Sequence, residues 1–480
     1  MTRFSMENVL FICYHQTRTG VSWRSYALQK TFRRYKKWIN EKEKTALLVS
    51  GARQTGKTFL IRECLKELKV SYVEFNFIER PDVVRLFSES KDLGAKDILV
   101  GLSFLSDKPM KEGETIIFFD EIQEYKEIAT LIKFLVDEGS FRYILSGSLL
   151  GVELKGIRST PVGYMKAIQM FPLDLEEFYM AMGLTKQAFE LLRSSYNEAR
   201  AIPEAIHNRL MRGFMNYMIV GGMPQAVQSF VDDSDYSKVM DIHNAIIPGY
   251  GNDFSKYETE DRKLKLRKIY DLIPAELAAK NKRYVFNNLD RNFRPENYES
   301  SLECLVSSGV AIAVYNITEP KIPLMLNSKS NLFKLFMSDV GLLTTRYGKA
   351  TIKSILDGNT TLNCGAMYEN FVAQELNSHG FSPYYFNSKK QGEVDFVIEE
   401  NLQAVPIEVK SGKDYQIHSA LNNILSDRNY GIKKAIVLCN DNLKVNGPVT
   451  YLPIYMTMFI KKDDEVLPKA EKTTLRDIQV

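Results

Sequence analysis

An eight-residue loop between two apolar segments constrains this chain more than any other feature. Apolar residues 46–49 predict a buried strand before the loop, and residues 59–61 open a predicted helix after it. A glycine-rich loop at that place presents backbone N–H groups at the start of a helix, where they bind phosphate. The sequence therefore predicts a nucleotide site formed by Gly51, Ala52, Arg53, Gln54, Thr55, Gly56, Lys57 and Thr58.

The residue types within this loop give it the pattern G-x-x-x-x-G-K-T. Gly51 and Gly56 supply bare backbone at the tight points of the loop. Lys57 is expected to reach the β- and γ-phosphates, and the hydroxyl of Thr58 is expected to bind Mg²⁺. The predicted cofactors are therefore ATP and Mg²⁺.

Two carboxylates follow a second buried strand, which is predicted for residues 115–119. In a site for phosphoryl transfer, Asp120 would hold Mg²⁺ through water, and Glu121 would orient or deprotonate the attacking water. The alternative is a strand that ends in an acidic loop without a catalytic role. The presence of the phosphate loop in the same chain favours the catalytic interpretation.

A third short apolar strand, predicted for residues 143–145, ends in Ser146-Gly147-Ser148. A small polar side chain at this place would touch the γ-phosphate or the attacking water, so Ser148 or Ser146 would sense the nucleotide. A serine-glycine turn after a strand is equally expected from turn chemistry. We assign the catalytic role in this turn to Ser148, beside Glu121 and Lys57, and the turn alternative stays open.

Composition places the chain among ordinary globular proteins, because 45% of its 480 residues are hydrophobic and 25% are charged. The formal net charge of +4 means that binding to nucleic acid would depend on local basic patches. The cysteines are scattered without metal-ligand spacing, which predicts a reducing cytoplasmic location. No apolar run approaches the roughly 20 residues that span a bilayer, so no membrane partner is expected.

The order of apolar runs predicts an α/β fold with several domains. After an N-terminal arm at 1–30, residues 31–170 alternate short apolar runs with helical stretches, which indicates a parallel sheet covered on both faces. Residues 171–260 are predicted to form a helical lid on this sheet, interrupted by the breaker at 221–224. The predicted strands of the sheet are 46–50, 71–77, 96–101, 115–120 and 143–147.

Residues 261–348 are predicted to form a winged-helix-like domain, since three helical stretches precede a two-stranded ribbon at 310–315 and 332–336. Its third helix carries Glu296, Glu299 and Glu303 and has no lysine or arginine. The positive charges lie upstream, at 262–268 and 280–283. Two partners stay open for this domain: DNA, bound through its phosphates, or a protein.

The last domain, 349–460, is a predicted small α/β unit followed by a tail at 461–480. If Glu399 faces Ala404 in its hairpin, the same register sets Asp395 opposite Glu408, with Lys410 on the same face. Asp395 and Glu408 would then hold Mg²⁺ for phosphodiester cleavage, with Glu369 from the preceding helix and Lys410 beside the water. The alternative is a surface ion pair between Asp395 and Lys410.

Taken together, these motifs resemble the AAA-type ATPases of bacteria and archaea that carry a C-terminal domain of unknown function. The resemblance covers about residues 30–460 and implies that the C-terminal domain is similar to the PD-(D/E)XK nuclease, or restriction-endonuclease-like, fold. Its core positions would be Asp395, Glu408 and Lys410. The motifs that carry the resemblance are residues 51–58, 119–123, 145–148, 172–178, 221–224, 338–342, 393–396 and 406–410.

One position departs from this family pattern. Many relatives have a glycine-arginine pair where residues 161–164 read Pro-Val-Gly-Tyr, so an arginine finger is missing there. Arg158 or Arg142 could substitute for it in a homo-oligomer, whose existence stays open.

Three functions follow from this reading. The leading hypothesis is a Mg²⁺-dependent ATPase whose nucleotide state controls the lid and the C-terminal domains. The alternatives are an ATP-regulated DNA-binding nuclease, and a nucleotide switch with an inactive nuclease-like fold that binds a protein partner.

Overall fold

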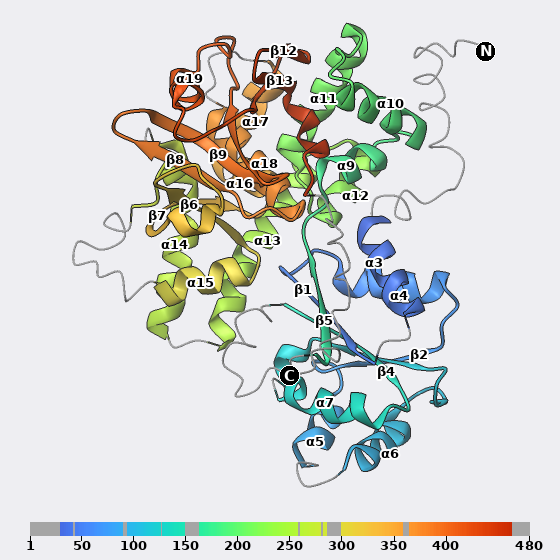
Figure 1. The fold of residues 1–480 in the computed structure, drawn as a ribbon. Coiled ribbons are helices and arrows are strands. Elements are labelled where there is room, and N and C mark those ends of the chain that lie inside the picture. Colours follow the sequence, from blue (N-terminus) through green and yellow to red (C-terminus); the bar gives the residue numbers. More distant parts are fainter. Residues whose placement is uncertain are drawn as a thin grey trace, which may run out of the picture.

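The chain folds into two sheet-containing parts joined by helices (Figure 1). The computed structural model describes residues 29–41, 44–89, 94–125, 127–148, 163–257, 260–279, 282–285, 299–358 and 364–462. The predicted N-terminal arm, apart from its last two residues, and Arg158 lie outside the described residues, as does the predicted C-terminal tail from residue 463 onward.

The first part contains a five-stranded parallel sheet in the order β2-β3-β4-β1-β5. This arrangement confirms the parallel α/β fold that the apolar runs predict. The strand β1 lies inside the sheet, between β4 and β5, so the phosphate loop begins at a central strand. The strands are β1 Ala46–Gly51, β2 Tyr72–Asn76, β3 Ile116–Asp120, β4 Arg142–Gly147 and β5 Met165–Met170.

Helices cover both faces of this sheet because its central strands are apolar on both sides. Leu47 and Phe118 pack with the helices of one face, and Leu48 and Phe119 pack with those of the other. The first group of helices is α3 Gln29–Asn40 and α4 Lys57–Glu67. The second group is α5 Pro81–Glu89, α6 Ala95–Leu105 and α7 Ile128–Glu138.

One strand prediction for this sheet is wrong: residues 96–101 belong to the helix α6. Ile98, Leu99 and Leu102 are buried at helical spacing, whereas Val100 and Phe104 are exposed. A short apolar run cannot be assigned to a strand or a helix by periodicity alone. The fifth strand is instead β5, where exposed and buried residues alternate.

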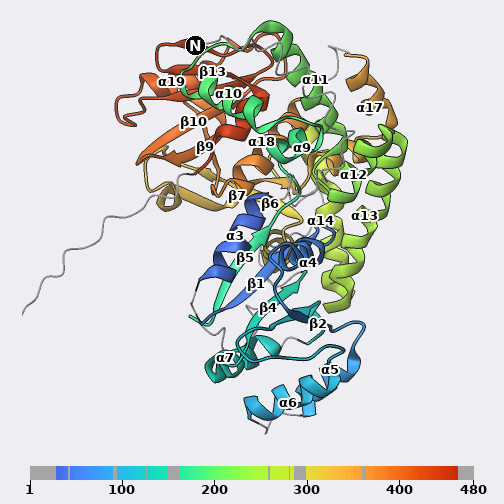
Figure 2. The same cartoon turned by 90° about the vertical axis from the view of Figure 1, so that its right-hand side faces the viewer.

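Seven α-helices lie between β5 and β6 in the described residues. The break predicted at 221–224 is confirmed, since α11 ends at Val220 and α12 begins at Pro224. In Figure 2, α13 runs from the upper part down to the level of α4. The helices are α9 Leu175–Ala181, α10 Lys186–Asn197, α11 Glu204–Val220, α12 Pro224–Asp233, α13 Tyr236–Tyr257, α14 Glu260–Ala278 and α15 Glu299–Ser307.

The second part contains a mixed eight-stranded sheet in the order β12-β13-β11-β10-β9-β8-β6-β7. Within it, β6 pairs in parallel with β8, and Tyr315 lies opposite Tyr384. The ribbon of β6 and β7 that was predicted as a wing therefore continues the C-terminal sheet. The strands are β6 Ala311–Ile317, β7 Ser328–Met337, β8 Tyr384–Ser388, β9 Gly392–Glu400, β10 Gln403–Val409, β11 Ala435–Cys439, β12 Lys444–Asn446 and β13 Val449–Pro453.

The predicted boundary between residues 348 and 349 thus falls inside one sheet, and the winged-helix assignment of 261–348 stays a prediction. The helices of this part complete the same unit. They are α16 Val340–Tyr347, α17 Lys349–Leu356, α18 Gly365–Ser378 and α19 Ser419–Ser426.

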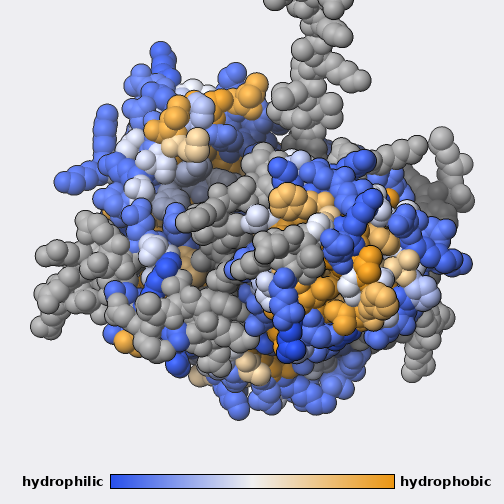
Figure 3. Space-filling model, turned by 90° about the horizontal axis from the view of Figure 1, so that it is seen from below, coloured by the Kyte–Doolittle hydropathy of each residue, from blue (hydrophilic) through white to orange (hydrophobic). Residues whose placement is uncertain are grey.

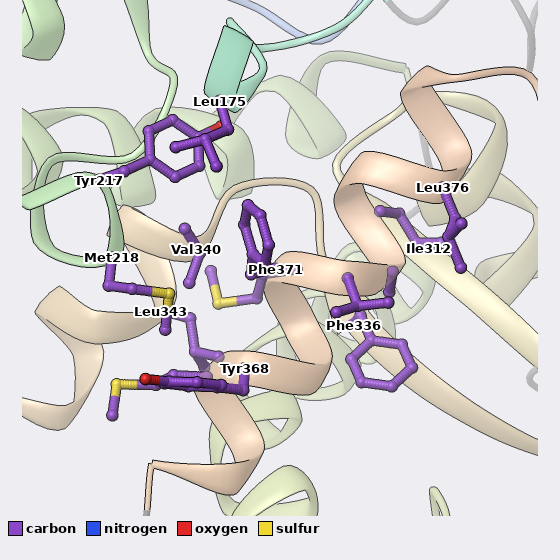
Figure 4. Packing of buried hydrophobic residues seen from close by; sticks show 14 of the residues in the cluster. Leu175, Tyr217, Met218, Ile312, Phe336, Val340, Leu343, Tyr368, Phe371 and Leu376 are labelled. Atoms are coloured by element: carbon purple, nitrogen blue, oxygen red, sulfur yellow. The ribbon is translucent and has the colours of Figure 1, made fainter. Parts of the chain in front are cut away.

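A single hydrophobic core joins the helical region to this sheet (Figure 4). Tyr217 and Met218 come from α11, Phe336 from β7 and Phe371 from α18, and all of them are buried. The predicted lid at 171–260 therefore packs mainly into the C-terminal part. Its core cluster includes Ala52 from the phosphate loop.

A tight contact, here called the glycine junction, connects β5, α11 and α16. The backbone of Leu173 donates to the carbonyl of Gly222 at 2.7 Å, and any side chain on Gly222 would overlap Leu173. Asp339, fully buried at the start of α16, accepts from the N–H groups of Gly222 at 2.6 Å and Leu342 at 3.0 Å. These contacts connect the end of the first sheet to the second part.

The face seen from below carries both polar and apolar groups (Figure 3). The exposed large apolar side chains of α6 and α7 include Val100, Phe104 and Phe134. Among the helices that the structure describes, none has the length and apolar character needed to cross a membrane.

Candidate functional site

The phosphate loop has the strand–loop–helix geometry that its sequence predicts. It leaves β1 at Gly51 and enters α4 at Lys57. Gly56 caps the helix with a φ of 87°, a conformation that glycine adopts without strain. A side chain at Gly51 would overlap the carbonyl of Met170 on β5, so the start of the loop also requires glycine.

The ammonium group of Lys57 lies within the curve of this loop. It donates to the carbonyl oxygens of Gly51 at 3.0 Å and Ala52 at 2.8 Å. Thr55 also donates to the carbonyl of Ala52, at 2.9 Å. A phosphate group would give Lys57 a charged acceptor, which forms a stronger hydrogen bond than a neutral carbonyl does.

Asp120 joins the loop to the neighbouring strands. Its carboxylate accepts from the hydroxyl of Thr58 at 2.9 Å and from the hydroxyl of Ser146 on β4. Asp120 is 2% exposed, so these two hydroxyl groups replace the hydrogen bonds that water would otherwise give its carboxylate. A hydroxyl and a carboxylate in direct contact are the hard oxygen donors that Mg²⁺ prefers. Thr58 and Asp120 therefore fit the ion that the loop motif implies.

Glu121 leaves the strand in a left-handed backbone conformation, with φ 55° and ψ 43°. This conformation costs a residue other than glycine roughly 1–2 kcal/mol. The side-chain amide of Gln123 donates to the carboxylate of Glu121. Gln123 is 5% exposed, and its own amide oxygen has no hydrogen-bond partner in the described part. The sequence analysis assigned no role to Gln123, although it stands two residues after the catalytic candidate.

Of the two serines around the end of β4, Ser146 within the strand contacts Asp120 directly. Ser148 is buried two residues further along, and the catalytic role assigned to it stays a prediction.

Arg142 lies far along its strand from this site, and its role as an arginine finger in a homo-oligomer stays a prediction. It is the first residue of β4, whereas Ser146 lies near the end of the same strand. Its guanidinium lies 3.9 Å from the ring centre of Trp38 and donates to the carbonyls of Trp38 and Ile39 at 2.5 and 2.6 Å. Arg142 thus holds α3 at the opposite end of the sheet.

Three elements of the second part touch the phosphate loop. The hydroxyl of Tyr250 on α13 lies 3.4 Å from the carbonyl oxygen of Arg53. A Cβ placed on Gly56 would lie 3.7 Å from Cγ of Pro224, at the start of α12. A Cβ on Gly309, in the turn between α15 and β6, would lie 3.5 Å from the backbone nitrogen of Ala52.

The second candidate site lies on the eight-stranded sheet. The hairpin register is confirmed, because Glu399 pairs with Ala404, and its continuation brings Asp395 to Glu408. The carboxylate of Asp395 accepts from the backbone of Val409 at 2.9 Å. Lys410 pairs with Glu408 at 2.8 Å. The surface pair of Asp395 with Lys410 that was the alternative is thus not formed.

A lysine that the sequence analysis did not consider lies among these carboxylates. Lys334 on β7 has no exposed surface, and its ammonium lies 2.8 Å from Glu393, 3.4 Å from Glu369 and 3.8 Å from Asp395. Lys282 also pairs with Glu369. The carboxylate cluster is defined here as Glu369, Glu393, Asp395 and Glu408.

Burial and charge shift the pKa values of this cluster in opposite directions. Burial and the neighbouring Glu369 and Glu408 raise the pKa of Asp395 well above its usual range. Burial also raises the pKa of Glu408, although Lys410 opposes the shift. Burial opposes ionisation of Glu369, but Lys334 and Lys282 outweigh it and lower its pKa.

The carboxylate cluster does not fit the metal that the nuclease resemblance implies. Across the described ranges, no group of three His, Cys, Asp or Glu side chains is arranged to hold a metal ion. At the carboxylate cluster itself, an ammonium group stands between the carboxylates.

Comparison with protein families divides the chain into three matched segments. Residues 43–179 match a family described as an AAA domain. Residues 211–351 match a domain of unknown function (DUF8612), and residues 364–456 match another (DUF4143). The first segment is thus similar to the AAA domain family, and β6 and β8 join the other two segments in one sheet. No significant match is found among curated proteins.

Solved structures with weak overall similarity include the following three. The Thermotoga maritima RuvB Holliday junction branch migration motor is 14% identical, with 64% of this chain and 89% of that chain covered and a TM-score of 0.27. Closed-state Hsp104 with ATPγS and casein is 14% identical, with 61% and 52% covered and a TM-score of 0.28. Aeropyrum pernix ORC1 in complex with DNA is 10% identical, with 70% and 92% covered and a TM-score of 0.26. Similarity at this level carries no argument about this chain.

Proposed function

We propose that this chain, whose residues 43–179 match the AAA domain family, is a Mg²⁺-dependent ATPase whose nucleotide state is transmitted to its C-terminal part. The observation that carries the proposal is the contact of Thr58 with Asp120 beside the phosphate loop. Residues of two separate elements, α4 and β3, thereby meet beside the loop, with the donor types that a nucleotide and its metal ion require.

Each residue of this site would have its own role in ATP hydrolysis. Lys57 and the backbone N–H groups of the loop bind and orient the phosphates. Thr58 and Asp120 would hold Mg²⁺, which neutralises charge on the phosphates when bound. Glu121 accepts a proton from the attacking water, and Gln123 keeps its carboxylate oriented. Ser146 holds Asp120 from the adjacent strand.

Transmission to the C-terminal part is supported by the packing around the loop. Pro224, Tyr250 and Gly309 lie against it, and each belongs to a different element. A change of loop conformation on nucleotide binding would therefore displace atoms of α12 and α13. The glycine junction then connects the start of α12 with α16 through Asp339.

Hydrogen exchange of the full chain tests this proposal. ATP with Mg²⁺ should slow exchange in the loop and also change exchange around residues 221–227 and 339–345. Lys57→Ala should remove both effects. A nucleotide response confined to the first sheet would refute transmission while leaving ATP binding intact.

The partner of the C-terminal part is open between DNA and a protein. ATPase rates measured with single- and double-stranded DNA at several salt concentrations distinguish the two. Stimulation by DNA that weakens as salt rises indicates contacts with phosphates, because such contacts release counterions. A rate that DNA does not change favours a protein partner.

A further inference from the structure

We infer that Lys334 is the permanent cation of the carboxylate cluster, and that the nuclease-like site of the C-terminal sheet takes no divalent metal ion. This inference goes beyond ATP hydrolysis, since it concerns a site on the other sheet. Residues that resemble a nuclease centre would then have a structural role that needs no metal ion.

The position of Lys334 carries the inference. Its side chain has no exposed surface, and three carboxylates from two elements lie within 4 Å of its ammonium group: Glu369 of α18, and Glu393 and Asp395 of β9. A buried ammonium group is costly unless it is paired and hydrogen-bonded. The surrounding carboxylates meet this requirement, so charge neutralisation here needs no added ion.

Strand pairing fixes the backbone of Lys334, and its side chain packs inside the sheet. The strand β7 pairs with β6, and Lys334 lies opposite Val314 in that register. Its ammonium lies 5.2 Å from the ring centre of Tyr385 on β8. A divalent ion among the same carboxylates would stand next to this fixed positive charge, and at low dielectric the repulsion is strong.

Two further lysines pair with carboxylates of the cluster. Lys282 binds the other oxygen of Glu369, and Lys410 binds Glu408 at 2.8 Å. One oxygen of Glu408 has no hydrogen-bond partner in the described residues. An ion at this oxygen would lie beside the ammonium group of Lys410, which already pairs with the same carboxylate.

The cluster therefore links parts of the sheet that are distant in sequence. Lys334 belongs to the segment 211–351, whereas its carboxylate partners belong to the segment 364–456. The ion pairs thus act together with the parallel pairing of β6 and β8.

Titration with Mn²⁺, followed by electron paramagnetic resonance, tests the inference in the full chain. The phosphate-loop site is disabled by Asp120→Asn, so that any remaining bound ion reports on the second sheet. In this background we expect no bound Mn²⁺ that depends on Asp395, up to roughly 1 mM, the weak end of protein affinities for divalent ions. The melting temperature should likewise not rise with Mn²⁺.

Two variants sharpen the test. Lys334→Met removes the cation and keeps a similar side-chain length, so it should either create Asp395-dependent Mn²⁺ binding or lower the melting temperature. Lys329→Met, an exposed lysine of the same strand, should do neither.

If Lys334→Met fails to fold, a second comparison still tests the inference. Mn²⁺ binding is then measured for Asp120→Asn alone and for Asp120→Asn combined with Asp395→Asn. Mn²⁺ binding that Asp395→Asn abolishes would overturn the inference. So would Mg²⁺-dependent nicking of plasmid DNA that is lost in Asp395→Asn.

Discussion

The hydroxyl of Thr58 and the carboxylate of Asp120 lie 2.9 Å apart, although 62 positions separate them in the chain. The contact forms because β3 and β1 flank β4, so the end of β3 faces the first turn of α4. Ser146 of the intervening strand holds the other oxygen of the same carboxylate. The fold therefore assembles the candidate site from elements that are distant in the sequence.

Lys57→Ala should weaken ATP binding by about 10- to 100-fold, because a hydrogen bond to a charged group contributes roughly 1.5–3 kcal/mol. Turnover should fall with it. The matched control is Lys66→Ala, an exposed lysine near the end of the same helix, which should leave affinity unchanged. Calorimetry with ATP and Mg²⁺ measures both variants. Equal affinities in the two would exclude the assigned role.

Glu121→Gln should separate binding from hydrolysis. Loss of a general base lowers turnover by roughly 10²–10⁴-fold, whereas the phosphate contacts remain. We therefore expect ATP affinity close to that of the unmodified chain. Glu63→Gln, an exposed carboxylate on α4, serves as the control and should keep full turnover. If Glu121→Gln hydrolyses ATP at the normal rate, another residue acts as the base.

Gly222→Ala should destabilise the chain by roughly 2–4 kcal/mol, because its methyl group would overlap the carbonyl of Leu173 and force the backbone to move. Gly249→Ala offers the opposite case. Gly249 lies in α13 with no atom within 4 Å of a new Cβ, so alanine should stabilise the helix by about 0.5–1 kcal/mol. Urea unfolding measures the difference, and similar effects of the two substitutions would contradict the packing at the glycine junction.

Asp339 should make stability depend on pH. Burial raises its pKa from 3.8 to about 6, despite the backbone donors that it binds. Between pH 3.8 and about pH 6, the folded state therefore binds more protons than the unfolded state. The resulting contribution to the free energy of unfolding is complete below about pH 4 and is lost as pH rises through about 6. The loss amounts to roughly 3 kcal/mol at most.

Comparison with Asp339→Asn isolates that contribution. The amide does not titrate, and its NH₂ group would face a backbone donor at a cost of about 1–3 kcal/mol at every pH. The stability advantage of the unmodified chain should therefore shrink between about pH 4 and pH 7. An advantage that stays constant over this range would show that Asp339 does not titrate there.

Local patterns predicted the strands, the loop and the helix around the candidate nucleotide site. The strand, the loop and the helix around Gly56 are consecutive in the chain, and Asp120 ends a strand of unbroken apolar residues. The hairpin with Glu399 opposite Ala404 could also be predicted from neighbouring residues, because a short turn sets its register.

Features that depend on distant segments escaped the sequence analysis. The pairing of β6 with β8 is parallel and has no local turn signal, so the ribbon looked like part of a separate domain. Lys334 stands between Phe333 and Leu335 in a strand, a pattern that usually indicates a solvent-facing lysine. Its three carboxylate partners come from later in the chain, and only the fold brings them together.

The parallel pair of β6 and β8 decides where this chain can be divided. A fragment that begins at residue 349, the predicted boundary, would lack β6 and leave β8 as an open edge with unpaired backbone groups. Tyr385 and Phe386, both fully buried in the intact chain, lie on that strand. Such edges add strands from other molecules and aggregate. A cut ahead of β6 would keep the edge covered, so the smallest separable C-terminal unit begins before Ala311.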